Sequence, residues 1–267
     1  MSETKEEPEV FNQQPKSLER IAELQIEEGQ AEYERSNKGL FLSALTAGLD
    51  LGFSVLIMAI LYSMFAEKVS EEVMTLIMAA TYPIGFIFVV LGRSALFTEH
   101  TALAILPVLD GKRTLKELGR NWGIICTGNL LGGYLIGAMI VWLGPRLHIL
   151  THESLEQIAL HLTEIKGITI LGSGLLAGWL MGLLSWLVTS SQDTISRIFI
   201  VFLITAAIGV GSLHHCVVGS TELFAGALVS DQISAMDYFS TQFWATLGNI
   251  IGGVFFVAIL KFQITQQ

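Results

Sequence analysis

The chain has 267 residues, of which 52% are hydrophobic and only 15% are charged. Soluble globular domains carry about 25% charged residues, so the composition excludes that class of protein. The net charge of −9 comes largely from the segment between Glu3 and Glu34, which is rich in acidic residues. No basic patch interleaved with aromatic residues occurs, so nucleic-acid binding is not indicated. The two cysteines lie inside apolar segments and predict no disulfide framework.

The polar start of the chain divides into two predicted segments. Residues 1–15 are acidic, contain two prolines and have little to bury, so they are predicted to be disordered. They also lack the short apolar stretch of a secretory signal. Residues 16–37 alternate apolar and charged side chains with helical spacing. This pattern predicts an amphipathic helix that lies at the membrane surface or against loops, ahead of a transmembrane domain over residues 38–267.

Six long apolar segments follow, and each is a candidate membrane span because about 20 apolar residues cross a bilayer as a helix. The predicted spans cover residues 39–65, 72–107, 119–144, 168–190, 197–230 and 237–261. The second and fifth are too long for single ordinary helices. Gly92–Ser94 interrupts the second, and glycines and serines between Gly209 and Ser220 interrupt the fifth. The sequence therefore predicts an all-α membrane protein of six transmembrane helices, with the second and fifth broken.

Lysine and arginine predict the orientation, because short cytoplasmic loops carry an excess of both. One side holds eight such residues, at positions 35, 38, 112, 113, 116, 120, 197 and 261, and the other holds three, at positions 68, 146 and 166. Both termini are therefore expected in the cytoplasm.

An internal repeat relates the two halves of the chain. Three similarities occur in the same order, namely residues 47–52 with 177–182, Leu96-Phe97 with Leu223-Phe224, and residues 128–133 with 248–253. Each half contains three spans, an odd number, so the second half enters the membrane inverted relative to the first. The repeats cover about residues 39–144 and 168–261. Inverted repeats of this kind place a solute pathway between the halves near the midplane of the bilayer.

Several ionisable residues lie in or near the spans, where a charge costs roughly 2.5–3.5 kcal/mol and usually faces a cavity or a partner. They are Asp50, Arg93, Glu99, His214, His215 and Glu222. One interpretation is a structural charge clasp, in which Arg93 pairs with Asp50, Glu99 or Glu222, with Lys166 as a further candidate cation. The other interpretation is that these residues form a polar site in the solute pathway, at the two breaks. Because adjacent helical residues point about 100° apart, only one of the two histidines can face the pathway.

Together these features resemble the formate/nitrite transporter family over about residues 38–262. The resemblance is carried by the six spans, the two breaks, Leu96-Phe97-Thr98 after the first break, and a histidine in the second. It implies an aquaporin-like protomer in the bilayer of a bacterial-type inner membrane, and a homopentamer with one pathway per subunit. It also implies passage of small monovalent anions such as formate, nitrite or hydrosulfide, often linked to protons, without a cofactor or a metal.

The resemblance also assigns individual residues. Thr98 corresponds to the loop threonine of the family, Leu96 and Phe97 to its hydrophobic constriction, and His215 to its central histidine. This sequence departs from the family at three positions, where Gly178 and Gly219 replace asparagines and Leu162 replaces a lysine.

These residues suggest a mechanism. A naked anion pays a large desolvation cost in an apolar constriction, whereas its conjugate acid does not. We hypothesise that Arg93, aided by Lys166 at the mouth, attracts the anion and that Thr98 binds it. His215 would then supply a proton, and the neutral acid would pass Leu96 and Phe97.

Two other functions remain open at this point. One is a channel for small neutral solutes or cations, with the acidic residues setting selectivity. The other is a non-conducting membrane scaffold whose charged groups only clasp helices together. An enzyme is not expected, because no nucleophile and base are spaced to converge on one substrate atom.

Overall fold

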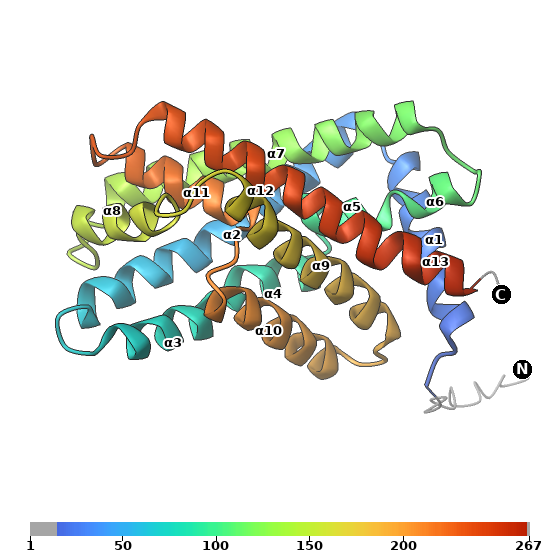
Figure 1. Cartoon of the computed structure of the whole chain (residues 1–267), viewed down its shortest axis with the longest axis horizontal. Helices are drawn as coiled ribbons and strands as arrows, with labels where there is room; N and C mark the ends of the chain where they lie inside the picture. The colour runs from blue at the N-terminus through green and yellow to red at the C-terminus, as the bar shows by residue number, and fades with distance from the viewer. Residues whose placement is uncertain (1–14, 266–267) are drawn as a thin grey trace, which may run out of the picture.

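The computed structural model describes residues 15–265, and all regular secondary structure in that range is helical (Figure 1). The helices are α1 (Leu18–Glu34), α2 (Asn37–Phe65), α3 (Glu71–Thr81), α4 (Pro83–Gly92), α5 (Phe97–Leu103), α6 (Leu106–Leu109), α7 (Leu115–Leu143), α8 (His152–His161), α9 (Ile168–Ser190), α10 (Thr194–Val210), α11 (Cys216–Ala227), α12 (Ala235–Gly253), the π-helix η1 (Val254–Ile259) and α13 (Leu260–Thr265). The sequence predicts disorder over residues 1–15, and residues 1–14 of that segment lie outside the described residues.

Side chains at the N-termini fix where several helices begin. The Thr114 hydroxyl accepts a hydrogen bond from the Glu117 backbone N–H, and the Glu117 carboxylate accepts one from the Thr114 backbone N–H. Ser234 and Asp237 form the same reciprocal pair at the start of α12. Such capping boxes satisfy N–H groups that the first turn of a helix leaves free. The two helices that they start are equivalent in the two halves of the chain.

Five continuous helical segments are long and apolar enough to cross a membrane. They cover residues 37–65, 71–92, 115–143, 168–190 and 235–265. The predicted span of residues 168–190 coincides with α9. The predicted fifth span is divided into α10 and α11, of 17 and 12 residues, and each is shorter than the hydrocarbon layer requires. The second span also breaks, between α4 and α5, so the prediction of an all-helical fold with two interrupted segments is confirmed.

The two halves run in opposite directions. Both ends of the described chain lie at one end of the molecule, beside α1 and α6, while α8 lies at the other (Figure 1). Helix α2 leads away from the end that holds the termini. Helix α9 returns to it, since Lys16 ahead of α1 donates a hydrogen bond to the Thr189 carbonyl at the end of α9 (2.5 Å).

The same close helix pair forms in each half, α2 with α7 and α9 with α12. Gly48 in α2 packs directly on the backbone of Asn129 in α7, and Gly178 in α9 packs on the backbone of Asn249 in α12. A side chain at either glycine would overlap the carbonyl oxygen of the asparagine. Small residues therefore let these helix backbones touch, which is how helices associate where lipid removes the hydrophobic driving force.

One of the three predicted repeat matches is wrong. The sequence pairs Leu96-Phe97 with Leu223-Phe224, but Asn129 binds the backbone N–H of Phe97 while Asn249 binds that of Cys216. The structural counterpart of Leu96 is therefore His215, and Leu223 lies two turns further along α11. The two Leu-Phe pairs are similar in sequence without occupying equivalent positions, because the equivalence is set by the asparagine contacts.

The amphipathic helix expected at residues 16–37 is α1, and it lies against the protein. Its buried residues, Ile21, Ala22, Gln25 and Gly29, face α5, α6, α9 and α13. The Gln25 amide donates hydrogen bonds to the hydroxyls of Ser185 (3.2 Å) and Thr189 (2.5 Å). Helix α1 is thus fastened across the end of the molecule that holds the termini.

Candidate functional site

The first break is held mainly by an asparagine of α7, and Ser43 of α2 accepts one further hydrogen bond, from the Ala95 N–H (3.0 Å). Helix α4 ends at Gly92, and Arg93 follows it in the left-handed conformation (φ 54°). The Asn129 amide donates to the carbonyls of Ala44 (2.8 Å) and Ala95 (2.9 Å), and its oxygen accepts from the N–H of Phe97 (2.8 Å). Because lipid offers no partners for free backbone groups, Asn129 supplies those that the break would lack.

The second break repeats this arrangement with Asn249. Its amide donates to the carbonyls of Gly174 (2.8 Å) and His214 (2.9 Å), and its oxygen accepts from the N–H of Cys216 (2.9 Å). Both asparagines are completely buried. The two breaks supply the backbone groups to which both asparagines bond.

The two breaks meet at one hydrogen bond. Thr98 Oγ1, one residue into α5, lies 2.7 Å from Nε2 of His215, the residue that caps α11. Both side chains are buried, and the ring of Phe86 packs edge-on against the His215 imidazole with centroids 5.1 Å apart. The structure thus places the predicted Thr98 and His215 in direct contact. Phe86 was missed, because one aromatic residue in an apolar span gives no signal.

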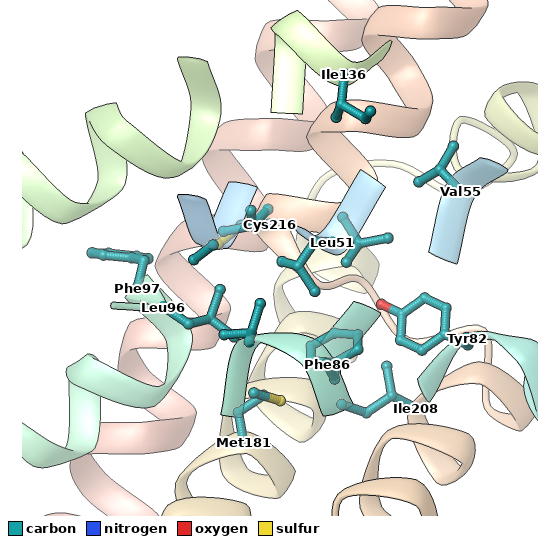
Figure 2. Packing of buried hydrophobic residues seen from close by; sticks show 14 of the residues in the cluster. Leu51, Val55, Tyr82, Phe86, Leu96, Phe97, Ile136, Met181, Ile208 and Cys216 are labelled. Atoms are coloured by element: carbon teal, nitrogen blue, oxygen red, sulfur yellow. The ribbon is translucent and has the colours of Figure 1, made fainter. Parts of the chain in front are cut away.

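Apolar side chains surround this pair. Leu96 of the first break and Cys216 of the second lie near Leu51 and Phe86, whereas the Phe97 ring points away from them and packs against Trp122 (Figure 2). Leu96 is fully buried and Phe97 almost fully. The Thr98 hydroxyl and the His215 imidazole are therefore two polar groups surrounded by apolar side chains. Such an arrangement suits a constricted pathway for a small solute.

The hydrogen-bond partners of His215 indicate which nitrogen of its ring carries the proton. Nδ1 accepts a hydrogen bond from the backbone N–H of Val218 (3.3 Å), so the neutral ring carries its proton on Nε2. Nε2–H then donates to Thr98 Oγ1. This leaves the Thr98 hydroxyl proton free to donate to a solute.

A cavity of about 480 Å³ leads to His215 from the end of the molecule that holds α8. It is bounded by α2, α3, α8, α10 and α11, and we call it the vestibule. Its ionisable lining residues are Tyr62, Glu71, Tyr82, His161, Glu164, His215 and Glu222. Leu162 and Gly219, two of the three positions where the sequence departs from the family pattern, also line it. Thr98, Leu96 and Phe97 lie beyond its inner end.

His214 does not reach the vestibule. Its Nε2 lies 3.1 Å from the Leu162 carbonyl, which can only accept, so Nε2 carries the proton. Its backbone N–H donates to Ser173 Oγ (3.0 Å), and the Ser173 hydroxyl donates in return to Nδ1 (3.0 Å). Both ring nitrogens are therefore used within the protein. Of the two adjacent histidines, only His215 faces the vestibule.

The expected charge clasp is not formed among the described residues. Arg93, which has a left-handed backbone conformation, is exposed and makes no ion pair with any described residue. Asp50 is half-buried and bonds the Ser94 side chain instead. Lys166 lies outside the vestibule and pairs with Asp237 (3.5 Å). Arg93 and Lys166 are therefore not placed to attract anions along this route.

The two remaining members of the clasp lie apart. Glu99 faces α1, near Glu28 and Glu32, and Glu222 lies in the vestibule. His100, beside Glu99, approaches Glu32 at 3.6 Å. Burial raises the pKa of Glu32, but its hydrogen bond to His100 and the charges of His100 and Arg35 outweigh that effect and leave the pKa below its ordinary value.

Comparisons with known proteins agree with the fold. The family model described as "Formate/nitrite transporter" matches residues 19–263. The chain is 29% identical to the inner membrane protein YfdC of Escherichia coli, over 88% of this chain and 74% of that protein. It is 27% identical to the nitrite transporter NirC of Salmonella typhimurium, over 86% of this chain and 84% of that protein.

Two solved structures share the fold. A structure described as "FNT family ion channel" superposes with a TM-score of 0.81 at 22% identity, covering 92% of this chain and 98% of that one. A structure described as "Pentameric formate channel with formate bound" gives a TM-score of 0.73 at 22% identity, covering 89% of this chain and 99% of that one. With nearly the whole described chain matched, the protein belongs to the formate/nitrite transporter family.

Proposed function

We propose that this protein carries small monovalent anions such as formate or nitrite across the membrane as their conjugate acids. The observation that carries the proposal is the buried hydrogen bond between Thr98 and His215, which joins the two helix breaks at the inner end of the vestibule. The names of relatives support the choice of solute, since they include a nitrite transporter and a formate channel. Passage of the neutral acid moves one proton with each anion, so transport is linked to the proton gradient.

The geometry favours a neutral His215 side chain, whereas the sequence suggested that His215 donates a proton to the solute. Only a cationic ring has a proton to give, and the ring is buried with one nitrogen accepting the Val218 N–H. Taking an isolated ion out of water is costly, so a cation without an acidic partner is disfavoured here. We therefore assign the pair a hydrogen-bonding role, in which Thr98 donates to the solute while His215 holds the hydroxyl. The proton that accompanies the anion is already on the solute when it reaches the pair, because the conjugate acid forms in equilibrium with the aqueous phase.

We propose a homopentamer with one pathway in each subunit, in a bacterial-type inner membrane with both termini cytoplasmic. The pentameric formate channel that shares the fold supports the assembly. The surface of the protomer supports it too, because Arg93 is exposed at a break within a span. An arginine at that depth costs roughly 2.5–3.5 kcal/mol when it faces lipid, and a neighbouring subunit would cover it.

Formate flux in proteoliposomes tests the role of the pair. We expect wild-type protein to pass formate, and His215→Ala and Thr98→Val to reduce the initial rate at least about tenfold, as lost hydrogen bonds worth about 1.4 kcal/mol or more would do. His148→Ala, in the loop between α7 and α8, is the control and keeps the wild-type rate. Equal rates for wild type and His215→Ala at every pH would remove the pair from the pathway.

A channel for small neutral solutes is the second candidate, and one observation favours it. Among the described residues that line the vestibule there is no lysine or arginine, whereas three are glutamates. Swelling of proteoliposomes in urea or glycerol that matches or exceeds swelling in formate would support this candidate over the first.

A further inference from the structure

Two buried polar side chains of the vestibule have no partner in the described part of the chain. Of the described polar residues that line the vestibule, Tyr82, His215 and Glu222 are buried, with 7%, 2% and 5% of their surfaces exposed. His215 bonds Thr98, whereas neither the Tyr82 hydroxyl nor the Glu222 carboxyl makes a hydrogen bond or an ion pair with any described residue. Buried polar groups without protein partners mark places where water or a ligand supplies the hydrogen bonds.

Glu222 lies on the same face of α11 as His215. Residues 215, 219 and 222 are spaced four and three apart, which places them on one face of a helix, and all three line the vestibule. Seven residues of helix put Glu222 roughly 10 Å from His215 along the axis, toward the mouth. Gly219 between them leaves the wall open, because a Cβ there would meet only Leu162, at 3.6 Å. A solute that enters from the mouth therefore passes Glu222 before it reaches Thr98 and His215.

The surroundings of Glu222 favour its neutral, protonated form. No lysine or arginine is among the described residues that line the vestibule. The other ionisable residues that line it are Tyr62 of α2, Glu71 of α3, Tyr82 between α3 and α4, His161 of α8, Glu164 after α8, and His215. His161 approaches the Glu164 carboxylate at 3.4 Å, where both are exposed at the mouth. A buried carboxyl group without a cation or a donor keeps its proton, because nothing offsets the free energy of taking its ion out of water.

We propose that Glu222, as a neutral carboxylic acid, and Tyr82 form a hydrogen-bond-donor site that binds the anion of the solute in the vestibule. Each side chain has one O–H to donate, and hydrogen bonds with one ionised partner are roughly twice as strong as neutral ones. Tyr82 lies close enough to Glu222 to interact with it electrostatically, which places the two groups in the same part of the cavity. The ligand is a small carboxylate or nitrite, whose oxygens accept from these donors.

The inference rests on the proposed function and adds the place where the solute first binds. The anion is the abundant form of a small acid near neutral pH, so a site that binds the anion is occupied when the neutral acid is scarce. The bound anion exchanges protons with the water of the cavity, and the conjugate acid that forms continues to Thr98 and His215. The site also explains how a vestibule lined by no lysine or arginine among the described residues receives an anion.

Formate uptake into proteoliposomes over a range of formate concentrations, at pH 6.5 on both sides, tests the site. We expect Glu222→Leu, which has no donor, to raise the KM at least about tenfold, as loss of a hydrogen bond to a charged group does, with a smaller change in the maximal rate. Glu222→Gln keeps an N–H donor and is expected to stay within about threefold of the wild-type KM, while Tyr82→Phe raises it about threefold to tenfold. Glu71→Gln and Glu164→Gln, at the exposed mouth, are controls that keep the wild-type KM.

Infrared difference spectra recorded with and without formate detect the contact independently of transport. Bound formate is expected to shift the C=O stretch of a protonated carboxyl group in the wild type. The shift is expected to be absent from Glu222→Gln. Glu99→Gln is the matched control and keeps the shift, because Glu99 faces α1 and not the vestibule.

The outcomes separate the two proposals. Size-exclusion chromatography first shows whether each variant keeps the wild-type oligomer, and if Glu222→Leu does not, Tyr82→Phe and the spectra decide. A wild-type KM in Glu222→Leu, an equal rise of the KM in Glu222→Leu and Glu222→Gln, or spectra without the shift overturns the site while formate transport stands. Wild-type protein that passes no formate at any concentration overturns the proposed function, whereas the spectra still report whether Glu222 binds the anion.

Discussion

Replacing Asn249 with alanine is expected to lower the free energy of unfolding by about 3–5 kcal/mol and to abolish transport. The change removes an amide that satisfies three buried backbone groups at the second break, the carbonyls of Gly174 and His214 and the N–H of Cys216. Each buried group left without a partner costs about 1–3 kcal/mol. The break also positions His215, so the contact with Thr98 is expected to be lost with it.

Denaturant titration in detergent micelles measures this change, and Asn121→Ala is a matched control. Asn121 is also a buried asparagine of a long helix, but its carbonyl oxygen has no hydrogen-bond partner among the described residues. We expect the control to change stability by less than about 1 kcal/mol. Equal effects of the two substitutions would show that Asn249 does not hold the break.

Replacing Gly178 with alanine is expected to destabilise the protein by about 2–4 kcal/mol. A Cβ at this position would overlap the backbone carbonyl of Asn249, so α9 and α12 would have to move apart. That separation would also strain the hydrogen bonds of Asn249 to the second break. The resemblance places an asparagine of the family here, and the packing shows why this chain cannot hold one without a different spacing of the two helices.

Gly172→Ala in the same helix is the control, and the expected change has the opposite sign. Gly172 is exposed, and a Cβ added there would meet nothing within 4 Å, so alanine gains helix propensity of up to about 1 kcal/mol. Thermal unfolding of the two variants in one detergent compares them directly. Destabilisation by both, or by neither, would contradict the close contact between α9 and α12.

Hydropathy and small residues predicted the helices and their breaks because both properties act locally. The long helical segments, of 22 to 31 mostly apolar and uncharged residues in total length, and the Gly92–Ser94 interruption follow from what lipid tolerates. The spacing of His214 and His215 showed only that one of them faces the pathway; the family resemblance assigned His215, and the fold shows how His214 is held away from it. Ser173 and the Leu162 carbonyl, which bind His214, are 41 and 52 residues away in the chain.

Charged side chains were harder to place, because their direction depends on backbone angles and on packing between distant segments. Arg93, at a position with positive φ, is exposed, whereas the sequence suggested a clasp with the other half. Glu222 was expected in that clasp and instead faces the vestibule. The equivalence of Leu96 with His215 was hidden too, because it follows from the asparagine contacts and not from similarity between the residues.

The central claim is that the solute crosses the contact between Thr98 and His215 as a neutral acid, and the response of formate flux to membrane voltage tests it most directly. Proteoliposomes with a potassium gradient and valinomycin set the voltage, and a pH dye records the protons. We predict that one proton enters with each formate and that the initial rate is the same at positive and negative voltage. A rate that follows the voltage without proton movement would mean that the naked anion crosses, and it would contradict this account.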